Sequence, residues 1–222
     1  MKSIFTILIV VAGCFGYFFY GINKNYESFY VGPTKSIPVF SYSADAGSEI
    51  PVAAILLHGF KCNKSQMIPM AKYLAKKGIR SYVVDLPGHG LASTDWQGVT
   101  HSVIPINQAI KEIKERDLTI EQKIVLVGWS TGAEIAKQIV EINKDVHHSI
   151  LIGTALENTN FVKSTNNLLI LNEPHDGNPQ ALYENRALEP YRTKYKGTIL
   201  EARNIPNSKH VTIVYLKDTF NE

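Results

Sequence analysis

One serine stands between two glycines where a hydrophobic run ends. The segment reads Gly128-Trp129-Ser130-Thr131-Gly132, preceded by "KIVLV" and followed by "AEIAKQIV". A serine at a sharp turn from strand to helix adopts a strained backbone that lifts its hydroxyl above the sheet, and the flanking glycines make room for the turn. The N-terminus of the following helix favours developing negative charge. The spacing therefore predicts a nucleophile at Ser130.

A serine nucleophile needs a base to take its proton and a carboxylate to orient that base. On a strand-turn-helix scaffold we expect these groups later in the chain, in the order acid and then histidine, each after its own strand. His210 follows "GTILEA" and the turn-rich "RNIPNSK" and is the predicted base. Asp176 follows the apolar run "LLIL" and is the predicted acid, with Glu173 and Glu157 as open alternatives.

The elements that must position these residues alternate between short β-branched runs and longer amphipathic stretches, which is the α/β pattern. The segments "AAILL", "KIVLV" and "LLIL" are apolar at consecutive positions, as in parallel strands covered on both faces. We expect a doubly wound, mostly parallel sheet with its ligand site at the carboxyl ends of the strands. The predicted strands are residues 37–43 (compatible with an antiparallel edge), 53–57, 81–85, 123–127, 149–152, 168–171 and 198–202, and the predicted helices are residues 64–77, 102–116, 131–143 and 211–219.

Five motifs in this order resemble those of the α/β-hydrolase superfamily of serine hydrolases, in particular its esterase-like and lipase-like members. They are "LLHGF", "DLPGHG", "GWSTG", "EPHD" and "SKH", and the resemblance covers nearly everything after residue 35. It implies Ser130 as the nucleophile, Asp176 as the orienting acid and His210 as the general base. It also implies an oxyanion hole formed by the backbone N–H groups of Phe60 and Thr131.

Other residues near these motifs receive supporting roles. We expect His58 to brace the oxyanion loop and "DLPGHG" to shape the site. Trp129 has two open interpretations: it lines an acyl pocket, or it packs beneath the turn. Only about fifteen residues, 154–168, separate two predicted strands at the position where many family members insert a helical cap. The sequence therefore predicts a minimal-cap member with an open site.

Composition limits the remaining choices. The chain has 222 residues, 45% hydrophobic and 19% charged, and after residues 1–22 it has room for one α/β-hydrolase domain, residues 23–222. The net charge of +3 comes with alternating signs, typical of solvated helix faces, so we expect no nucleic-acid partner. The cysteines, Cys14 and Cys62, leave no disulfide within the domain and no metal-type spacing. No cofactor or metal is expected, and the oligomeric state is not indicated.

The N-terminal segment, residues 1–22, contains an uncharged apolar run over residues 4–20. Its layout resembles a secretory signal, and the run is at the short end for spanning a bilayer. Val11-Ala12-Gly13-Cys14 resembles a bacterial lipobox. The aromatic residues that follow fit an uncleaved anchor with an interfacial belt. All three alternatives predict a membrane-anchored or exported domain, for example in a bacterial cell envelope.

The predicted reaction follows from these parts. Ser130, deprotonated by His210, attacks an acyl carbonyl, and water then releases the acid from the acyl-enzyme. A small acyl ester is the favoured substrate, because an oxygen leaving group demands the least additional machinery. Thioesters and amides remain open, and so does a membrane-tethered, non-catalytic binding protein with the hydrolase fold.

Overall fold

The structure is a computed structural model that describes residues 26–44, 47, 49–118, 122–155, 160–164, 167–172, 188–190 and 200–205. The predicted N-terminal segment, residues 1–22, and the predicted last helix, residues 211–219, lie outside these ranges. Among the described residues, no helix combines the length and the apolar character needed to cross a bilayer.

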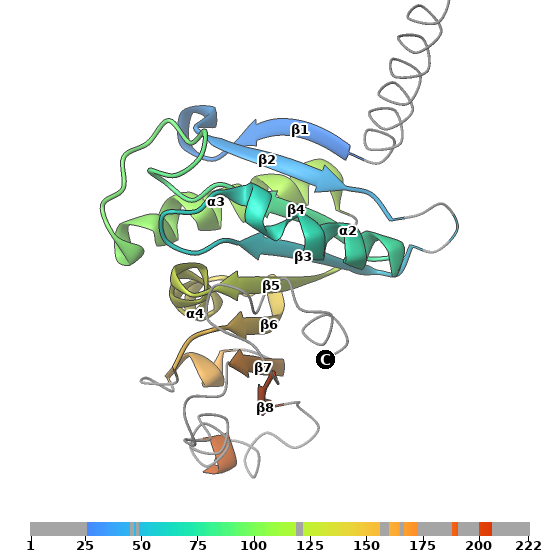
Figure 1. Cartoon of the computed structure of the whole chain (residues 1–222), viewed down its shortest axis with the longest axis vertical. Coiled ribbons are helices and arrows are strands. Elements are labelled where there is room, and N and C mark those ends of the chain that lie inside the picture. The colour runs from blue at the N-terminus through green and yellow to red at the C-terminus, as the bar shows by residue number, and fades with distance from the viewer. Residues whose placement is uncertain are drawn as a thin grey trace, which may run out of the picture.

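One eight-stranded sheet organises the described part of the chain, in the order β1-β2-β4-β3-β5-β6-β7-β8 (Figure 1). β2 runs antiparallel to both β1 and β4, and all other neighbours are parallel. The predicted doubly wound, mostly parallel sheet is thereby confirmed. The strands are β1 Tyr26–Val31, β2 Ile37–Tyr42, β3 Val52–Leu57, β4 Arg80–Val84, β5 Lys123–Trp129, β6 Val146–Ile152, β7 Asn167–Asn172 and β8 Leu200–Asn204.

The first strand is the element that the sequence analysis missed. β2 is antiparallel as expected, but the edge of the sheet is β1, "YESFYV", which pairs with β2 along its whole length. Most of the side chains of β1 are partly or fully exposed, and only Val31 is buried. An edge strand with so little buried surface carries a weak hydrophobic pattern, which explains the omission.

The helices lie close to their predicted positions. They are α2 Ile68–Lys76, α3 Val99–Asp117 and α4 Thr131–Ile142, with the short 3-10 segments η1 Pro33–Lys35, η2 Lys64–Met67 and η3 Asn160–Lys163. The side chain of Asn63 caps η2 by accepting the N–H of Ser65 at 2.9 Å. The sequence prediction combined η2 and α2 into one helix, residues 64–77, because both present apolar residues to the same sheet face.

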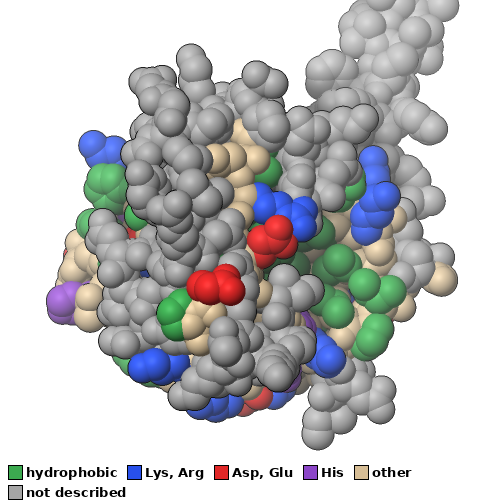
Figure 2. Space-filling model, turned by 90° about the horizontal axis from the view of Figure 1, so that it is seen from below, with side chains coloured by type: hydrophobic (Ala, Val, Ile, Leu, Met, Phe, Trp, Pro, Cys, Tyr) green, Lys and Arg blue, Asp and Glu red, His purple; other side chains and the backbone are tan. Residues whose placement is uncertain are grey.

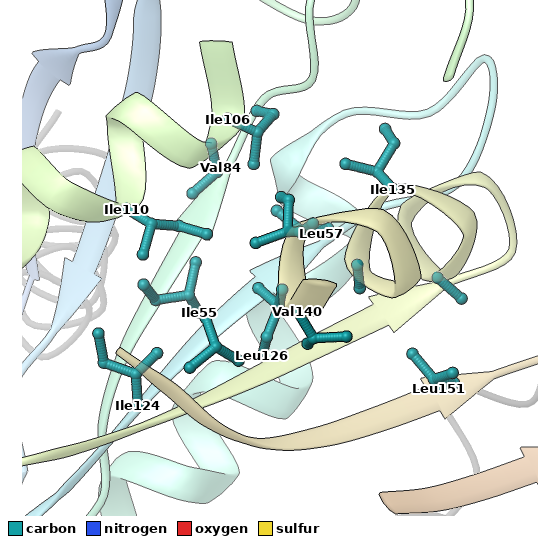
Figure 3. Close-up of a cluster of buried hydrophobic side chains, with 14 of the residues drawn as sticks. Ile55, Leu57, Val84, Ile106, Ile110, Ile124, Leu126, Ile135, Val140 and Leu151 are labelled. Atoms are coloured by element: carbon teal, nitrogen blue, oxygen red, sulfur yellow. The ribbon is translucent and has the colours of Figure 1, made fainter. Parts of the chain in front are cut away.

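Two hydrophobic clusters pack on opposite faces of the sheet. α3 and α4 cover one face, where Ile106 and Ile135 belong to the same buried cluster as Ile55 of β3 (Figure 3), and α2 covers the other (Figure 1). Alternate residues of β3 divide between the two layers, with Ile55 in the first cluster and Leu56 in the second. This two-sided burial is the reason why the central strands are apolar at consecutive positions.

Two expectations from the sequence, a minimal cap and mixed surface charge, agree with the structure. β6 and β7 are joined by residues 153–166, which include only η3 among the described elements, so this connection is too short for a large helical cap. Seen from below, Lys and Arg side chains are interspersed with Asp and Glu side chains on the described part of the face (Figure 2).

Two isoleucines of α3 provide a matched test of the packing. Ile106 is fully buried between α3 and the sheet, whereas Ile104 is 64% exposed. Ile106→Ala should lower the free energy of unfolding by about 2–5 kcal/mol, because it removes buried methyl groups and leaves a cavity. Ile104→Ala should change it by less than about 0.5 kcal/mol. Urea denaturation measures both, and equal effects would contradict the assigned orientation of α3.

Candidate active site

Ser130 lies at the turn between β5 and α4, where its backbone has φ 52° and ψ −116°. A side-chain-bearing residue rarely adopts this conformation, which costs about 1–3 kcal/mol when the surroundings enforce it. Hydrogen bonds of both backbone groups of Ser130, its N–H and its carbonyl, hold it in this conformation. The N–H of Ser130 donates to the carbonyl of Ile152 at 2.8 Å, and its carbonyl accepts the N–H groups of Ala133 and Glu134 at 2.9 and 3.1 Å. The sharp turn expected from the sequence is therefore present.

The two glycines of the motif are required by close backbone contacts. A Cβ atom at Gly132 would lie 2.4 Å from the carbonyl oxygen of Leu57 and 2.7 Å from that of His58. At Gly128 it would lie 2.4 Å from the carbonyl oxygen of Gly132. Because backbone atoms cannot move aside cheaply, both positions need glycine. The first turn of α4 consequently lies directly against the carboxyl end of β3.

The side chain of Trp129 packs beneath the loop that follows β3, residues 58–63, which we call the β3–η2 loop. Trp129 is only 3% exposed, and a Cβ atom at Gly59 would lie 2.4 Å from its ring. The ring of Trp129 is therefore a packed side chain, but it packs against Gly59 of the β3–η2 loop, whereas the sequence predicted either packing beneath the Ser130 turn or lining of an acyl pocket. The ring thus fills the space next to Gly59 and supports the β3–η2 loop.

His58 connects the β3–η2 loop to the loop after β4. Its Nε2 accepts the N–H of Leu86 at 3.0 Å, so Nδ1 must carry the proton and donate to the carbonyl of Gly59 at 2.7 Å. The side chain is fully buried, and this burial lowers the pKa of His58 to about 4. His58 is thus neutral, and it braces the β3–η2 loop as expected from the sequence.

The carboxyl ends of β5 to β8 form one continuous edge. Backbone hydrogen bonds continue past the strand ends, from Gly153 to Leu171 and from Ile205 to Asn172, both at 2.8 Å. The side chain of Asn172 also accepts the N–H of Thr154 at 3.0 Å. The carboxyl ends of β5, β7 and β8 therefore lie at the same edge of the sheet, where ligand sites of open α/β sheets form.

The predicted acid and base follow β7 and β8 in the chain. Asp176 and His210 lie outside the described residues, as do the alternative acids Glu157 and Glu173. Their places in the site remain predictions.

The two predicted oxyanion donors flank the contact between β3 and α4. Thr131 is the first residue of α4, and Phe60 follows Gly59 in the β3–η2 loop. Among the described residues, no backbone carbonyl outside the helices and strands accepts a hydrogen bond from the N–H of either residue. At Thr131 the free donor follows from the helix start, and such donors are suited to binding an anion.

One residue pair beside this region was not singled out by the sequence analysis. Lys64 and Asp85 form a buried ion pair at 2.6 Å that connects η2 with the end of β4. No group of three or more His, Cys, Asp and Glu side chains in the described part of the chain is arranged to hold a metal ion.

The sheet order, the strained serine turn and the glycine contacts together define an α/β-hydrolase. A family model described as "Serine aminopeptidase, S33" matches residues 50–204. The chain therefore belongs to this family of α/β-hydrolases, which confirms the resemblance found in the sequence.

Curated relatives match only parts of their own length. A thermostable monoacylglycerol lipase from Bacillus sp. is 28% identical over 109 residues, which are 48% of this chain and 42% of the lipase. Secretin PulD from Klebsiella pneumoniae is 25% identical over 144 residues, 64% of this chain and 21% of the secretin. The chain thus spans less than half the length of either relative.

Solved structures share the fold over most of the chain. An α/β serine hydrolase without lid from Xanthomonas campestris has a TM-score of 0.66 at 16% identity, covering 85% of this chain and 87% of its own. An esterase from Pyrococcus furiosus has a TM-score of 0.68 at 14% identity, covering 87% of this chain and 85% of its own. At such identities the likeness concerns the fold alone.

The neutral state of buried His58 predicts a pH-dependent stability. Its pKa is about 4 in the folded chain and about 6.5 when unfolded, so the unfolded state binds the proton first as the pH falls. The stabilisation is complete above about pH 6.5 and is lost progressively toward pH 4. Between pH 7 and about 4.5, the wild type should lose about 2–3 kcal/mol more unfolding free energy than His58→Gln.

Urea denaturation across this pH range measures the difference in unfolding free energy between the two proteins. The contributions of the carboxylates are common to both proteins and largely cancel. His101→Gln, which makes the same substitution at an exposed histidine of α3, serves as the control for the change of residue type. Parallel profiles for the wild type and His58→Gln would show that the buried ring does not resist protonation.

Proposed function

We propose that this chain hydrolyses carboxylic esters through an acyl-enzyme on Ser130, with His210 as the general base and Asp176 as the acid that orients it. The observation that carries the proposal is the strained turn at Ser130, with φ 52° at the start of α4. Such strain costs folding energy, and it is retained where the serine hydroxyl has a use. Membership of a hydrolase family supports the same interpretation.

The strand order supports the participation of His210 and Asp176. β5 and β8 are separated by β6 and β7 in the sheet, which corresponds to about 14 Å. His210 comes six residues after Asn204, the last residue of β8, and an extended segment of that length spans about 20 Å. Asp176 comes four residues after Asn172, the last residue of the intervening β7. Both chain lengths are sufficient for a triad with Ser130.

The backbone N–H groups of Phe60 and Thr131 are proposed to stabilise the oxyanion. When Ser130 attacks, the carbonyl oxygen of the substrate becomes negative, and donors that are already fixed need no reorganisation at that moment. One such donor lowers the barrier by roughly 3 kcal/mol. Close packing of Gly132 against the carboxyl end of β3 keeps the two donors in neighbouring elements.

Esters are favoured over other acyl compounds because an alkoxide leaving group demands the least assistance. The lipase relative and the esterase of similar fold are consistent with this choice. Amide hydrolysis is the second candidate, because the matching family is described as a serine aminopeptidase. Thioester cleavage by the same groups and a non-catalytic binding role are the remaining alternatives.

The short connection between β6 and β7 favours an open site and hence short to medium acyl chains. Residues 1–22 are proposed to carry the domain to or across a membrane, as an uncleaved anchor, a lipoprotein signal or a cleaved signal.

A panel of p-nitrophenyl esters from acetyl to palmitoyl tests the proposal on the full chain. We expect hydrolysis that is fastest for short to medium chains and that falls by at least about a thousandfold in Ser130→Ala and in His210→Ala, because the groups act as a unit. Asp176→Asn should fall by a comparable order, about 10³ to 10⁴. Glu173→Gln and Glu157→Gln are the matched controls and should remain within about threefold of the wild type.

Three results would contradict parts of the proposed function. Hydrolysis that survives in Ser130→Ala would contradict the acyl-enzyme. Faster cleavage of p-nitroanilides of amino acids than of esters would favour the aminopeptidase alternative. A preference for palmitoyl esters alone would contradict the open site.

A further inference from the structure

Lys64 and Asp85 form an ion pair that is almost completely removed from solvent. The Nζ atom of Lys64 lies 2.6 Å from Oδ2 of Asp85, and the side chains are 4% and 0% exposed. The ammonium group also lies 4.5 Å from the ring centroid of Phe40 on β2. Burying two charges carries a desolvation cost that only good geometry offsets, so such a pair is weak evidence for stability. Its position in the fold points to a different use.

The carboxylate of Asp85 holds two segments at once. Its Oδ1 accepts the backbone N–H of Lys64 at 2.6 Å, and its Oδ2 accepts the backbone N–H of Leu91 at 2.9 Å. A Cβ atom at Gly90 would lie 2.3 Å from Oδ2, so the loop after β4 closes tightly over the carboxylate. Asp85 therefore ties the start of η2 to the loop after β4.

Together with His58, this pair fixes both ends of the β3–η2 loop. At the start of the loop, His58 accepts the N–H of Leu86, and directly after its end Lys64 binds Asp85. The two partners, Leu86 and Asp85, are neighbouring residues directly after β4. Phe60, the proposed oxyanion donor, lies between the two fixed points.

The β3–η2 loop needs such external restraint because of its own backbone. Lys61, directly after Phe60, has φ 57°, a conformation that side-chain-bearing residues rarely adopt. The turn is closed by one backbone hydrogen bond, from the N–H of Cys62 to the carbonyl of Gly59, at 3.3 Å. A strained turn with one long bond would relax if an end were released.

We infer that the Lys64–Asp85 pair is a positioning device that aims the N–H of Phe60 at the oxyanion. This inference rests on the proposed function. It assigns Lys64 and Asp85 no contact with the substrate and no proton transfer. Since the donor acts mainly on the transition state, loss of the pair should lower kcat and leave KM nearly unchanged.

The test compares variants of the full chain with p-nitrophenyl butyrate, and kcat is expressed per serine titrated with a fluorophosphonate. We expect Lys64→Met to lower kcat by about 10- to 100-fold, with KM within about threefold of the wild type. Inhibition by an alkyl trifluoromethyl ketone, which forms a tetrahedral adduct on serine, should weaken by the same factor as kcat/KM. A merely structural role would reduce the fraction of titratable serine and leave these normalised values unchanged.

A matched control is available on α3. Lys114 and Asp145 also form an ion pair at 2.6 Å, but their side chains are 32% and 42% exposed. Lys114→Met should leave kcat, KM and inhibition unchanged. Because Lys64→Met leaves the charge of Asp85 buried without a partner, the double variant Lys64→Met with Asp85→Asn removes both charges and keeps the test available if the single variant does not fold.

The possible outcomes distinguish the positioning role of the Lys64–Asp85 pair from the proposed hydrolysis by Ser130. A folded double variant with wild-type kcat and inhibition would overturn the positioning role while leaving the proposed function intact. A wild type without Ser130-dependent hydrolysis would overturn the proposed function, and this inference with it. Reduced kcat with matched loss of inhibition, in Lys64→Met or in the double variant, would support the inference.

Discussion

The contact between the first turn of α4 and the carboxyl end of β3 is the constraint on which the rest of the site depends. Gly132 lies so close to the carbonyl groups of Leu57 and His58 that no side chain fits between them. This closeness sets Ser130, two residues earlier, beside the β3–η2 loop. It also forces the chain to turn within one residue, and the positive φ of Ser130 is the result. The strained backbone of Ser130 and the closeness of α4 to β3 therefore have the same cause, which is the close packing of Gly132.

Polar groups around this contact hold backbone segments in place. The neutral ring of His58, the hydrogen bond from Ser130 to Ile152 and the buried pair of Lys64 and Asp85 each join segments that are distant in the chain. A site built from such fixed dipoles need not reorganise as charge develops on a substrate. Strained turns and buried charges thus lower the stability of the fold, and they keep the site arranged before a substrate binds.

The sequence was most informative where burial and sterics act locally. Consecutive apolar residues predicted the central strands, and the spacing of Gly128, Ser130 and Gly132 predicted the turn and its place between β5 and α4. The edge strand β1 was missed because most of its side chains are exposed, so that it carries little hydrophobic pattern. Lys64 was missed because a lysine beside Lys61 and Asn63 resembles a solvated surface residue. Its partner Asp85 is 21 residues away and reaches it only through tertiary packing. Asp176 and His210 remain predictions from chain order.

Covalent trapping tests most directly whether the strained Ser130 is the group that attacks. The folded full chain, treated with a fluorophosphonate and digested, is analysed by mass spectrometry for the peptide that carries the phosphonate. We expect one adduct, on the hydroxyl of Ser130, and none in a folded Ser130→Ala chain. An unlabelled wild type, or an adduct that persists in Ser130→Ala, would contradict this role.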